Sequence, residues 1–371
     1  MSRRVLCVNL GSQTAKLTVL DVRDDAVPGA AAAPAVDVET PLDAVAAEAH
    51  LAALDVASVD IVAYRVVRTT DRSGARAVPF DAAARAAILA AAEFAPLHTG
   101  PVLAAFDGLS ARLPRARHIA VFDGAFHHTI PAPAAVYGLP YDDFTAGWRK
   151  VGFHGLSHAY AAARTAALLG DREPVRKLVS AHLGGGASIA AVAGARSIDT
   201  TMGFTPLDGL IMATRSGTLD AGMLLAYMRR KQLSIGDTEE LLTHRSGLLG
   251  LAGSADMRAV IAAKQGGDAR AALGYAAFVY RVSAAIGAMT AALGGLDAIA
   301  FLGGIGENAA SVRADACGPF VFLGAAIDPG RNADPRADAI ISTEGSRVKV
   351  LRIRAREDWM MALAARDCVS P

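Results

Sequence analysis

The chain has 371 residues, of which 53% are hydrophobic, and its formal net charge is +1. This length and composition predict a globular chain with room for two domains, each with its own core, and argue against disorder. The near-neutral charge gives no reason to expect nucleic acid or a membrane as a partner. Cys7, Cys317 and Cys368 are widely separated and lack disulfide or metal-ligand spacing. Together with an N-terminus that lacks the pattern of a secretory signal, this predicts a cytoplasmic protein.

Short runs rich in Val and Ile alternate with helical patterns along the chain. The expected strands span residues 5–10, 15–22, 59–67, 118–123, 177–183 and 187–193. The expected helices span residues 81–92, 155–169, 218–231, 237–243, 254–265, 269–293, 307–316 and 356–366. The most apolar of these, 269–293, contains Arg270 and Arg281, so we expect a core helix there. The alternation predicts an α/β fold.

Two segments far apart in the chain repeat one pattern. His182, Leu183 and Gly184 can be aligned with Asn9, Leu10 and Gly11, each at the end of one strand and before a turn of small residues and a second strand. We therefore expect two similar halves, each opening with a hairpin. Turns without bulky side chains let backbone N–H groups approach phosphate oxygens, and Lys16 adds a positive charge near the first turn. An ordinary exposed β-turn is the alternative interpretation.

Five of the nine histidines, together with a candidate carboxylate, lie in the middle of the chain between residues 123 and 182. Asp123 follows the buried-looking strand HIAVFD, which predicts a carboxylate at a strand terminus facing a cleft. His154 and His158 are spaced to share a helix face, as zinc ligands do, but no Glu follows His154 as an HExxH motif requires. For His127, His128 and His158 we expect structural roles.

Five ordered motifs identify a family. They read VFDGAFHHTIPAPAAVYGLPY from residue 121, VGFHGLSHAYAAAR from 151, AHLGGGAS from 181, SIDTTMGFTPLDGLIMATRSGTLD from 197 and FLGGIGEN from 301. Together they resemble the acetate kinase family over essentially the whole chain. The resemblance implies a duplicated two-domain actin-like ATPase (acetate and sugar kinase) fold with the active site in the interdomain cleft, and a homodimer. It also implies the reversible reaction of ATP with acetate to give ADP and acetyl phosphate. The implied metal ion is Mg²⁺, and Mn²⁺ is the alternative.

The resemblance also implies domain boundaries and site residues. The N-terminal domain is expected over 1–124, with the C-terminal helix 359–371 packing back on it, and the nucleotide-binding domain over 125–358. The implied catalytic residues are Asp123, Arg65, Arg215 and His154; the implied carboxylate pocket is Arg65, Val67, Leu97, Phe153 and Pro206. Nucleotide contacts are implied for Ser12, Thr14, Lys16, His182, Gly184, Gly185, Gly186, Asp256, Met257, Arg258, Gly304, Ile305, Gly306 and Asn308, and metal contacts for Asn9 and Glu357.

The chain departs from the family pattern at several positions. Tyr64, Arg68, Thr69 and Thr70 change the segment HRVVHGG, Gly185 replaces an Asn, Thr99 and Gly100 replace Asn-Pro, and Ala221 replaces a Pro. These departures leave propionate kinase, butyrate kinase and a pyrophosphate-linked acetate kinase open as alternatives. A catalytically weak relative that binds nucleotide or acyl phosphate is the alternative from another class of protein. The charged set favours the enzyme, since a binding module would have no need of both arginines together with Asp123.

Overall fold

The computed structural model describes residues 2–11, 14–30, 32–41, 45, 58–70, 73–94, 96–170, 175–334 and 338–369, with the backbone alone for Thr14, Pro96 and Leu97. The chain forms two compact units, which are described separately here. Unit 1 comprises Met1–His128, His154–Ala167 and Arg356–Pro371, and unit 2 comprises Thr129–Phe153 and Leu168–Ala355. The boundaries expected at residues 124 and 358 stay a prediction.

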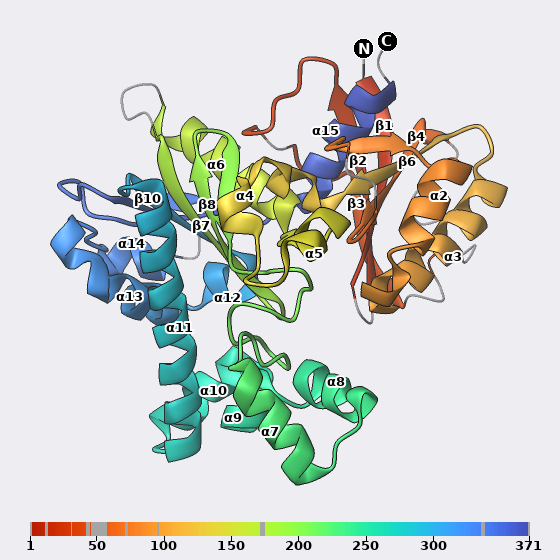
Figure 1. Ribbon diagram of the computed structural model, residues 1–371. Coiled ribbons are helices and arrows are strands. Elements are labelled where there is room, and N and C mark those ends of the chain that lie inside the picture. Colours follow the sequence, from red (N-terminus) through yellow and green to blue (C-terminus); the bar gives the residue numbers. More distant parts are fainter. Residues whose placement is uncertain are drawn as a thin grey trace. The chain divides into compact units, whose positions relative to one another are not determined.

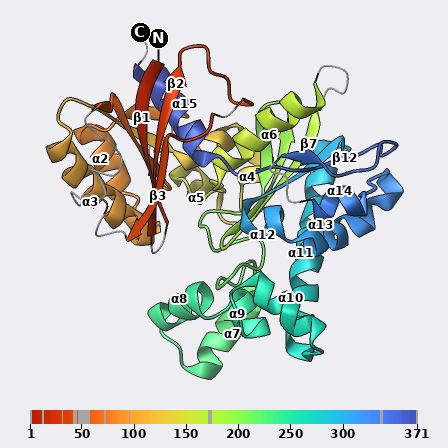
Figure 2. The ribbon, with the colours of Figure 1, turned by 180° about the vertical axis from the view of Figure 1, so that it is seen from behind.

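Each unit has one six-stranded sheet and several helices (Figures 1 and 2). The strands are β1 (Ser2–Leu10), β2 (Thr14–Arg23), β3 (Val36–Pro41), β4 (Ile61–Val66), β5 (Ala77–Pro79), β6 (Arg117–Phe122), β7 (Lys177–Leu183), β8 (Ala187–Ala193), β9 (Arg196–Thr200), β10 (Ala298–Leu302), β11 (Ala339–Ile340) and β12 (Lys349–Arg352). The α-helices are α2 (Ala82–Leu89), α3 (Pro96–Arg112), α4 (Ala132–Ala135), α5 (Tyr141–Ala146), α6 (Gly155–Leu169), α7 (Ala221–Lys231), α8 (Ile235–His244), α9 (Gly247–Ala252), α10 (Met257–Gln265), α11 (Ala269–Leu293), α12 (Gly303–Asn308), α13 (Ala310–Cys317), α14 (Pro329–Ala333) and α15 (Glu357–Val369). Three 3₁₀ segments are η3 (Ala92–Phe94), η4 (Asp123–Thr129) and η5 (Gly318–Leu323).

The two sheets have the same topology. The strand order is β3-β2-β1-β4-β6-β5 in unit 1, and β9-β8-β7-β10-β12-β11 in unit 2 when its sheet is followed in the matching direction. The three outer pairings of each sheet are antiparallel, and the two central pairings on either side of β4 and of β10 are parallel. The predicted internal repeat is therefore confirmed: β1 and β2 correspond to β7 and β8, and Asn9 and His182 hold equivalent places in them.

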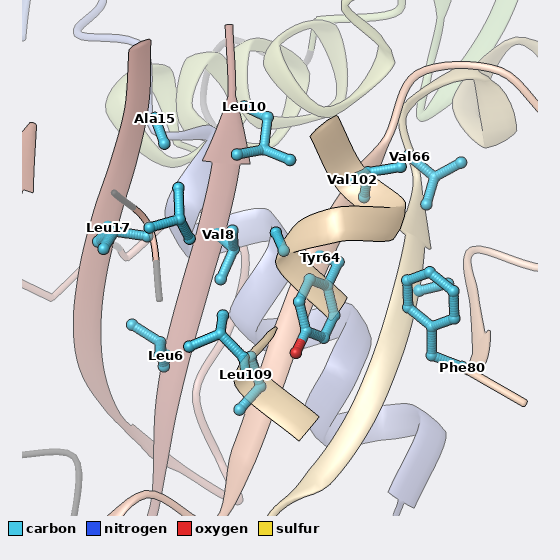
Figure 3. Close-up of a cluster of buried hydrophobic side chains, with 14 of the residues drawn as sticks. Leu6, Val8, Leu10, Ala15, Leu17, Tyr64, Val66, Phe80, Val102 and Leu109 are labelled. Atoms are coloured by element: carbon cyan, nitrogen blue, oxygen red, sulfur yellow. The ribbon is translucent and has the colours of Figure 1, made fainter. Parts of the chain in front are cut away.

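The core of unit 1 lies between one face of its sheet and helices α2 and α3 (Figure 3). Successive side chains of a strand point to opposite faces, so Leu6 and Val8 of β1 and Tyr64 of β4 enter this core together with Leu109 of α3. The alternate residues point to the opposite face, against which α15 packs: Cys7 donates from Sγ to the backbone oxygen of Asp358 at 3.2 Å. The sheet is thus covered on both sides, as its continuously apolar strands require.

Every strand and helix expected from the sequence is present, with ends displaced by a few residues. The longest element without an expectation is α3, whose pattern is broken by Gly100 and by Pro101 inside the helix. Helix α11 is long and apolar enough to cross a membrane by length and composition, a test that core helices also pass. Its buried residues, among them Phe278, Val282, Ile286 and Met289, recur every three or four positions and form one face.

Candidate active site

The site in unit 1 begins with the alternation of its strands. Because Val8 and Tyr64 point into the α3-side core, their neighbours Asn9 and Arg65 point to the opposite face, where α15 begins with Glu357. Strand β6 is the parallel neighbour of β4 and ends at Phe122, so Asp123 follows at the same edge of the sheet. Residues from distant parts of the chain therefore meet at the carboxyl ends of β1, β4 and β6.

Arg65 is the centre of this cluster. Its guanidinium donates to Oδ2 of Asp123 at 2.8 Å and to Oδ1 of Asn9 at 3.1 Å, and lies 3.2 Å from Oε2 of Glu357. Asn9 donates from Nδ2 to the same Glu357 oxygen at 2.8 Å, and Ser157 donates from Oγ to the other at 2.8 Å. Hydrogen bonds thus connect every member of the cluster, and they hold its charged groups in one arrangement.

Asp123 is held by backbone as well as by Arg65. Its side chain has no exposed surface, and it accepts hydrogen bonds from the N–H groups of His154 at 2.9 Å and Leu156 at 3.2 Å. Between these residues, Gly155 comes so near that a Cβ there would lie 2.0 Å from the Asp123 backbone oxygen. His154 itself has a positive φ of 56°, which is uncommon outside glycine. The first turn of α6 thus wraps the carboxylate.

The charges of the cluster do not cancel. Burial by itself lowers the pKa of Arg65, but the Asp123 and Glu357 carboxylates raise it, and the net effect is a pKa above the ordinary value. Arg65 is therefore permanently charged and faces two carboxylates. One positive charge against two negative charges leaves the cluster, counted over these three groups, with an excess of one negative charge.

In unit 2, glycines meet at the carboxyl edge of the second sheet. Strands β7 and β10 are parallel neighbours, with Leu302 opposite His182, and each is followed by a glycine run. Gly303 has a φ of +79°, and a Cβ there would lie 2.8 Å from the backbone oxygen of Leu183. At Gly184 a Cβ would lie 3.8 Å from the backbone nitrogen of Gly304, so the two runs adjoin. Gly185 and Gly304 have open space where a Cβ would be, which leaves their backbone accessible to a ligand.

Arg215 lies in unit 2, in the segment without helix or strand between β9 and α7. Its guanidinium is half-buried and donates to the backbone oxygen of Pro206 at 3.1 Å. Burial lowers its pKa, and within the described part of the chain it makes no ion pair. An arginine that is partly desolvated and not neutralised by a carboxylate is suited to binding an anion.

The expected nucleotide residues Asp256, Met257 and Arg258 form the start of α10. Asp256 is its N-cap, accepting from the backbone N–H of Arg258 at 2.9 Å, and the two side chains form an ion pair at 2.8 Å. Met257 is buried and Arg258 is 89% exposed. In α12, Asn308 donates from Nδ2 to the backbone oxygen of Gly304 at 2.8 Å, Gly306 is buried, and Ile305 lies between Gly304 and Gly306.

The remaining expected residues are found in varied settings. Lys16, opposite Asn9 in the β1–β2 hairpin, pairs with Asp37 at 3.1 Å and is half exposed. Phe153 is buried, whereas Val67 and Pro206 are partly buried. Arg68, one of the departures from the family pattern, is buried with its guanidinium 5.5 Å from the centre of the Phe94 ring. Ser12 and the side chains of Thr14 and Leu97 lie outside the described residues.

The other histidines of the central segment pack against one another. His127 and His158 are both buried, with ring centres 5.6 Å apart in an edge-on arrangement. Among the described residues, no three His, Cys, Asp or Glu side chains are grouped so that they could hold a metal ion by themselves. His154 and His158 therefore do not form a zinc site with other described residues.

Sequence reasoning missed two residues that build the unit 1 cluster. Ser157 orients Glu357, and Gly155 permits the first turn of α6 to approach Asp123. Both belong to the segment FHGLSHAY, which was singled out for its histidines. A glycine and a hydroxyl flanked by two histidines were the available signal, but Glu357 and Asp123, which they contact, come from other parts of the chain.

The fold and this cluster define a two-unit α/β enzyme with duplicated sheets. A model of the acetokinase family matches residues 5–363. An acetate kinase of Gloeobacter violaceus is 45% identical over 318 residues, which cover 85% of this chain and 77% of that protein. The crystal structure of acetate kinase from Porphyromonas gingivalis superposes with a TM-score of 0.86 at 30% identity, covering 99% of this chain and all of that one. A propionate kinase structure from Francisella tularensis gives 0.87 at 29% identity, again over 99% and 100% of the chains. The chain belongs to the acetokinase family.

Proposed function

We propose that this protein is an acetate kinase that transfers the γ-phosphoryl group of ATP to acetate, forming ADP and acetyl phosphate. A carboxylate oxygen attacks the γ-phosphorus as the bond to the bridging oxygen of ADP breaks, and no proton needs to be removed because acetate is already ionised. Family membership supports the reaction. The observation that carries the proposal is the Arg65 cluster, in which a permanently charged guanidinium is fixed between two carboxylates.

In unit 1 we assign Arg65 to the substrate carboxylate and Asp123 to positioning. Asp123 and Asn9 restrict the guanidinium to one orientation, so little entropy is lost when it binds an anion. For the alkyl group the proposed apolar residues are Val67 and Leu97 of unit 1, and Phe153 and Pro206 of unit 2. His154, whose backbone is bound to Asp123, is proposed to stabilise the transferring phosphoryl group.

In unit 2 we assign Arg215 to the transferring phosphoryl group, because it is partly desolvated and makes no ion pair in the described part of the chain. His182 with Gly184, Gly185 and Gly186 would bind the phosphates. Asp256, Met257, Arg258, Gly304, Ile305, Gly306 and Asn308 would bind the adenosine. Ser12, Thr14 and Lys16 of the first hairpin are proposed further phosphate contacts.

The donor set of unit 1 fits Mg²⁺, with Mn²⁺ as an alternative. Glu357 and Asn9 offer a carboxylate and an amide oxygen, which are hard ligands, and the cluster has an excess of one negative charge. The ion, when bound, would neutralise phosphate charge. Ser157 and Asn9 would keep Glu357 oriented toward it.

Propionate kinase is the second candidate, favoured by the close superposition on the enzyme of Francisella tularensis. One methylene in an apolar pocket is worth only about 1–3 kcal/mol, so the two acids are separated weakly by such a wall. Butyrate, pyrophosphate as phosphoryl donor, and a weakly active binding protein are further outcomes that the test below distinguishes.

We further propose a cytoplasmic homodimer with domains over 1–124 plus 359–371 and over 125–358. Leu273 and Tyr280 are 65% and 70% exposed and lie seven positions apart on one face of α11, which we propose as an apolar contact for a second copy. Cys7, Cys317 and Cys368 are all free thiols, consistent with a reducing compartment.

Trapping acyl phosphate with hydroxylamine tests the activity. Purified protein, Mg²⁺ and ATP are incubated with acetate, propionate, butyrate or no acid, and pyrophosphate is assayed separately as donor. We expect the largest signal with acetate. A maximum with propionate would support the second candidate, and silence with every acid despite ATP binding would support the binding protein.

A further inference from the structure

The segment that carries Arg215 has no regular structure of its own. Residues 201–219 form neither helix nor strand, and most of them are buried or partly buried. The guanidinium of Arg215 is held by this same segment, because it donates to the backbone oxygen of Pro206 at 3.1 Å and to the sulfur of Met212 at 3.7 Å. What holds this backbone therefore sets where the guanidinium lies.

The backbone around Arg215 is held by the junction between α8 and α9, which spans residues 242–248. The N–H groups of Ser246 and Leu248 donate to the backbone oxygens of Thr214 and Met212 at 2.9 and 2.8 Å. In the other direction, Ser216 donates from its backbone N–H to the oxygen of Leu242 at 3.0 Å. Bonds on both sides of Arg215 thus tie it to one helical junction.

A side-chain hydrogen bond reinforces the junction. Thr214 donates from Oγ1 to the backbone oxygen of Thr243 at 2.8 Å, immediately before Arg215. Helix α9 packs in turn on α10 and α11, and Figure 1 shows α7, α8, α9 and α10 gathered at one end of α11. The junction is therefore anchored to the longest helix of unit 2.

Gly247 makes this close approach possible. It is buried, has a φ of +61°, and a Cβ there would lie 2.3 Å from the backbone oxygen of Met212 and 2.8 Å from that of Arg215. Both obstacles are backbone atoms, so no side chain can rotate away to make room. Any residue other than glycine must push the Arg215 backbone away from α9.

We propose that Gly247 is a positioning residue for phosphoryl transfer, because it allows the α8–α9 junction to hold the Arg215 backbone in register. The inference rests on the proposed role of Arg215. Displacement of a catalytic group by about 1 Å can lower a rate about 100-fold. The effect falls mainly on kcat, because Arg215 is the group that is displaced. The segment meets the proposed phosphate contacts at Gly185, whose backbone oxygen accepts from the N–H of Ala213 at 3.1 Å, so a smaller effect on ATP binding accompanies it.

Gly247→Ala tests this, with Gly267→Ala as the matched control. Gly267 also has a positive φ, +89°, and lies in the same helical region, but no atom is within 4 Å of where its Cβ would be. The two variants therefore share the cost of a left-handed backbone and differ in the displacement of Arg215. We expect kcat of Gly247→Ala to be about 100-fold below that of Gly267→Ala, with a much smaller change in the Kd for ATP. Equal kcat values for the two would overturn the inference.

Arg215→Ala separates this inference from the proposed function. If Arg215→Ala keeps full activity, the proposed role of Arg215 fails; if it loses activity while Gly247→Ala matches its control, only the positioning role fails. In the Arg215→Ala background, Gly247→Ala should lower kcat little further, because the group that it displaces is gone. If Gly247→Ala does not fold, Thr214→Val is the deciding variant, because it removes only the hydrogen bond to Thr243. A fall in kcat at constant Kd for ATP then supports the inference, and an unchanged kcat overturns it.

Discussion

Arg65 on β4 and Asp123 at the end of the neighbouring strand β6 form an ion pair with a nitrogen-to-oxygen distance of 2.8 Å, and the Asp123 side chain has no exposed surface. A carboxylate without access to water depends on its partners for its charge. The parallel pairing of β4 and β6 places the two residues together, so the sheet itself supports the pair.

Arg65→Ala should therefore damage both stability and activity. Removing one partner of a buried ion pair costs about 3–5 kcal/mol, because the other charge is left without compensation. Urea unfolding should show a loss of this size, and hydroxamate trapping a fall in kcat of about 100-fold or more. The double variant Arg65→Ala with Asp123→Asn should recover part of the stability but none of the activity. Recovery of both would contradict the catalytic assignment.

Glu357→Gln should weaken the use of metal. The variant keeps the size of the side chain and a partner for Ser157, but it loses the charge that we assign to Mg²⁺. The Mg²⁺ concentration needed for half-maximal activity should rise about 10-fold or more, measured by titration at saturating ATP. Asp107→Asn, in the exposed ion pair with Arg85, is the control for loss of a carboxylate in unit 1 outside the cluster. An unchanged Mg²⁺ dependence of Glu357→Gln would refute the metal assignment.

Two glycine substitutions should have opposite effects on stability. Gly155→Ala puts a methyl group 2.0 Å from the Asp123 backbone oxygen, so the first turn of α6 must move and the free energy of unfolding should fall. Gly287→Ala lies in the interior of α11, where the nearest atoms to the added methyl group belong to the Phe320 ring at 4.0 Å, and should raise that free energy by about 0.5–1 kcal/mol. Thermal or urea unfolding measures both. A Gly155→Ala protein as stable as the parent would show that Asp123 is not tightly wrapped by α6.

Gly185→Asn should improve nucleotide binding. This position departs from the family pattern, and no atom lies within 4 Å of where a Cβ would be, so a side chain can begin there without displacing its neighbours. One added hydrogen bond to phosphate, worth about 0.5–1.5 kcal/mol, should lower the Kd for ATP about 2- to 12-fold. Calorimetric titration of Gly185→Asn and of Gly185→Ala separates the amide from the added Cβ. Equal affinities for the two would place the phosphates away from residue 185.

His118 should make stability depend on pH. Burial lowers its pKa below the ordinary value of 6.5, although the hydrogen bond to the Leu113 oxygen opposes the shift. Since that oxygen only accepts, Nε2 carries the proton and Nδ1 accepts from the Tyr64 hydroxyl at 2.8 Å.

A depressed pKa means that the unfolded chain binds the proton more readily, so this contribution to stability is present above pH 6.5 and is lost as the pH falls through the folded pKa. Urea unfolding from pH 7.5 to pH 5 should show a smaller fall in stability for His118→Gln than for the parent protein. Parallel curves would show that His118 has no part in the pH dependence.

The sequence alone determined the class of fold, the duplication and most members of the Arg65 cluster. Apolar periodicity revealed the strands and helices because burial imposes it on local stretches of chain. Asp123 was recognisable from the strand before it, and Asn9 and His182 from their equivalent turns. Helix α3 was missed because Pro101 and Gly100 break its pattern, although tertiary packing against β1 and β4 sustains it.

Only the tertiary structure decided how these residues act on one another. Glu357 lies 348 positions from Asn9, and no local pattern could show that Asn9 and Ser157 would both donate to its carboxylate. The sequence also could not show that there is no room for a Cβ at Gly247, because this depends on backbone atoms of a segment some 30 residues earlier. Periodicity reports which face of an element is buried, whereas hydrogen bonds and steric clearances arise between elements, and they exist only once the sheet and helices have packed.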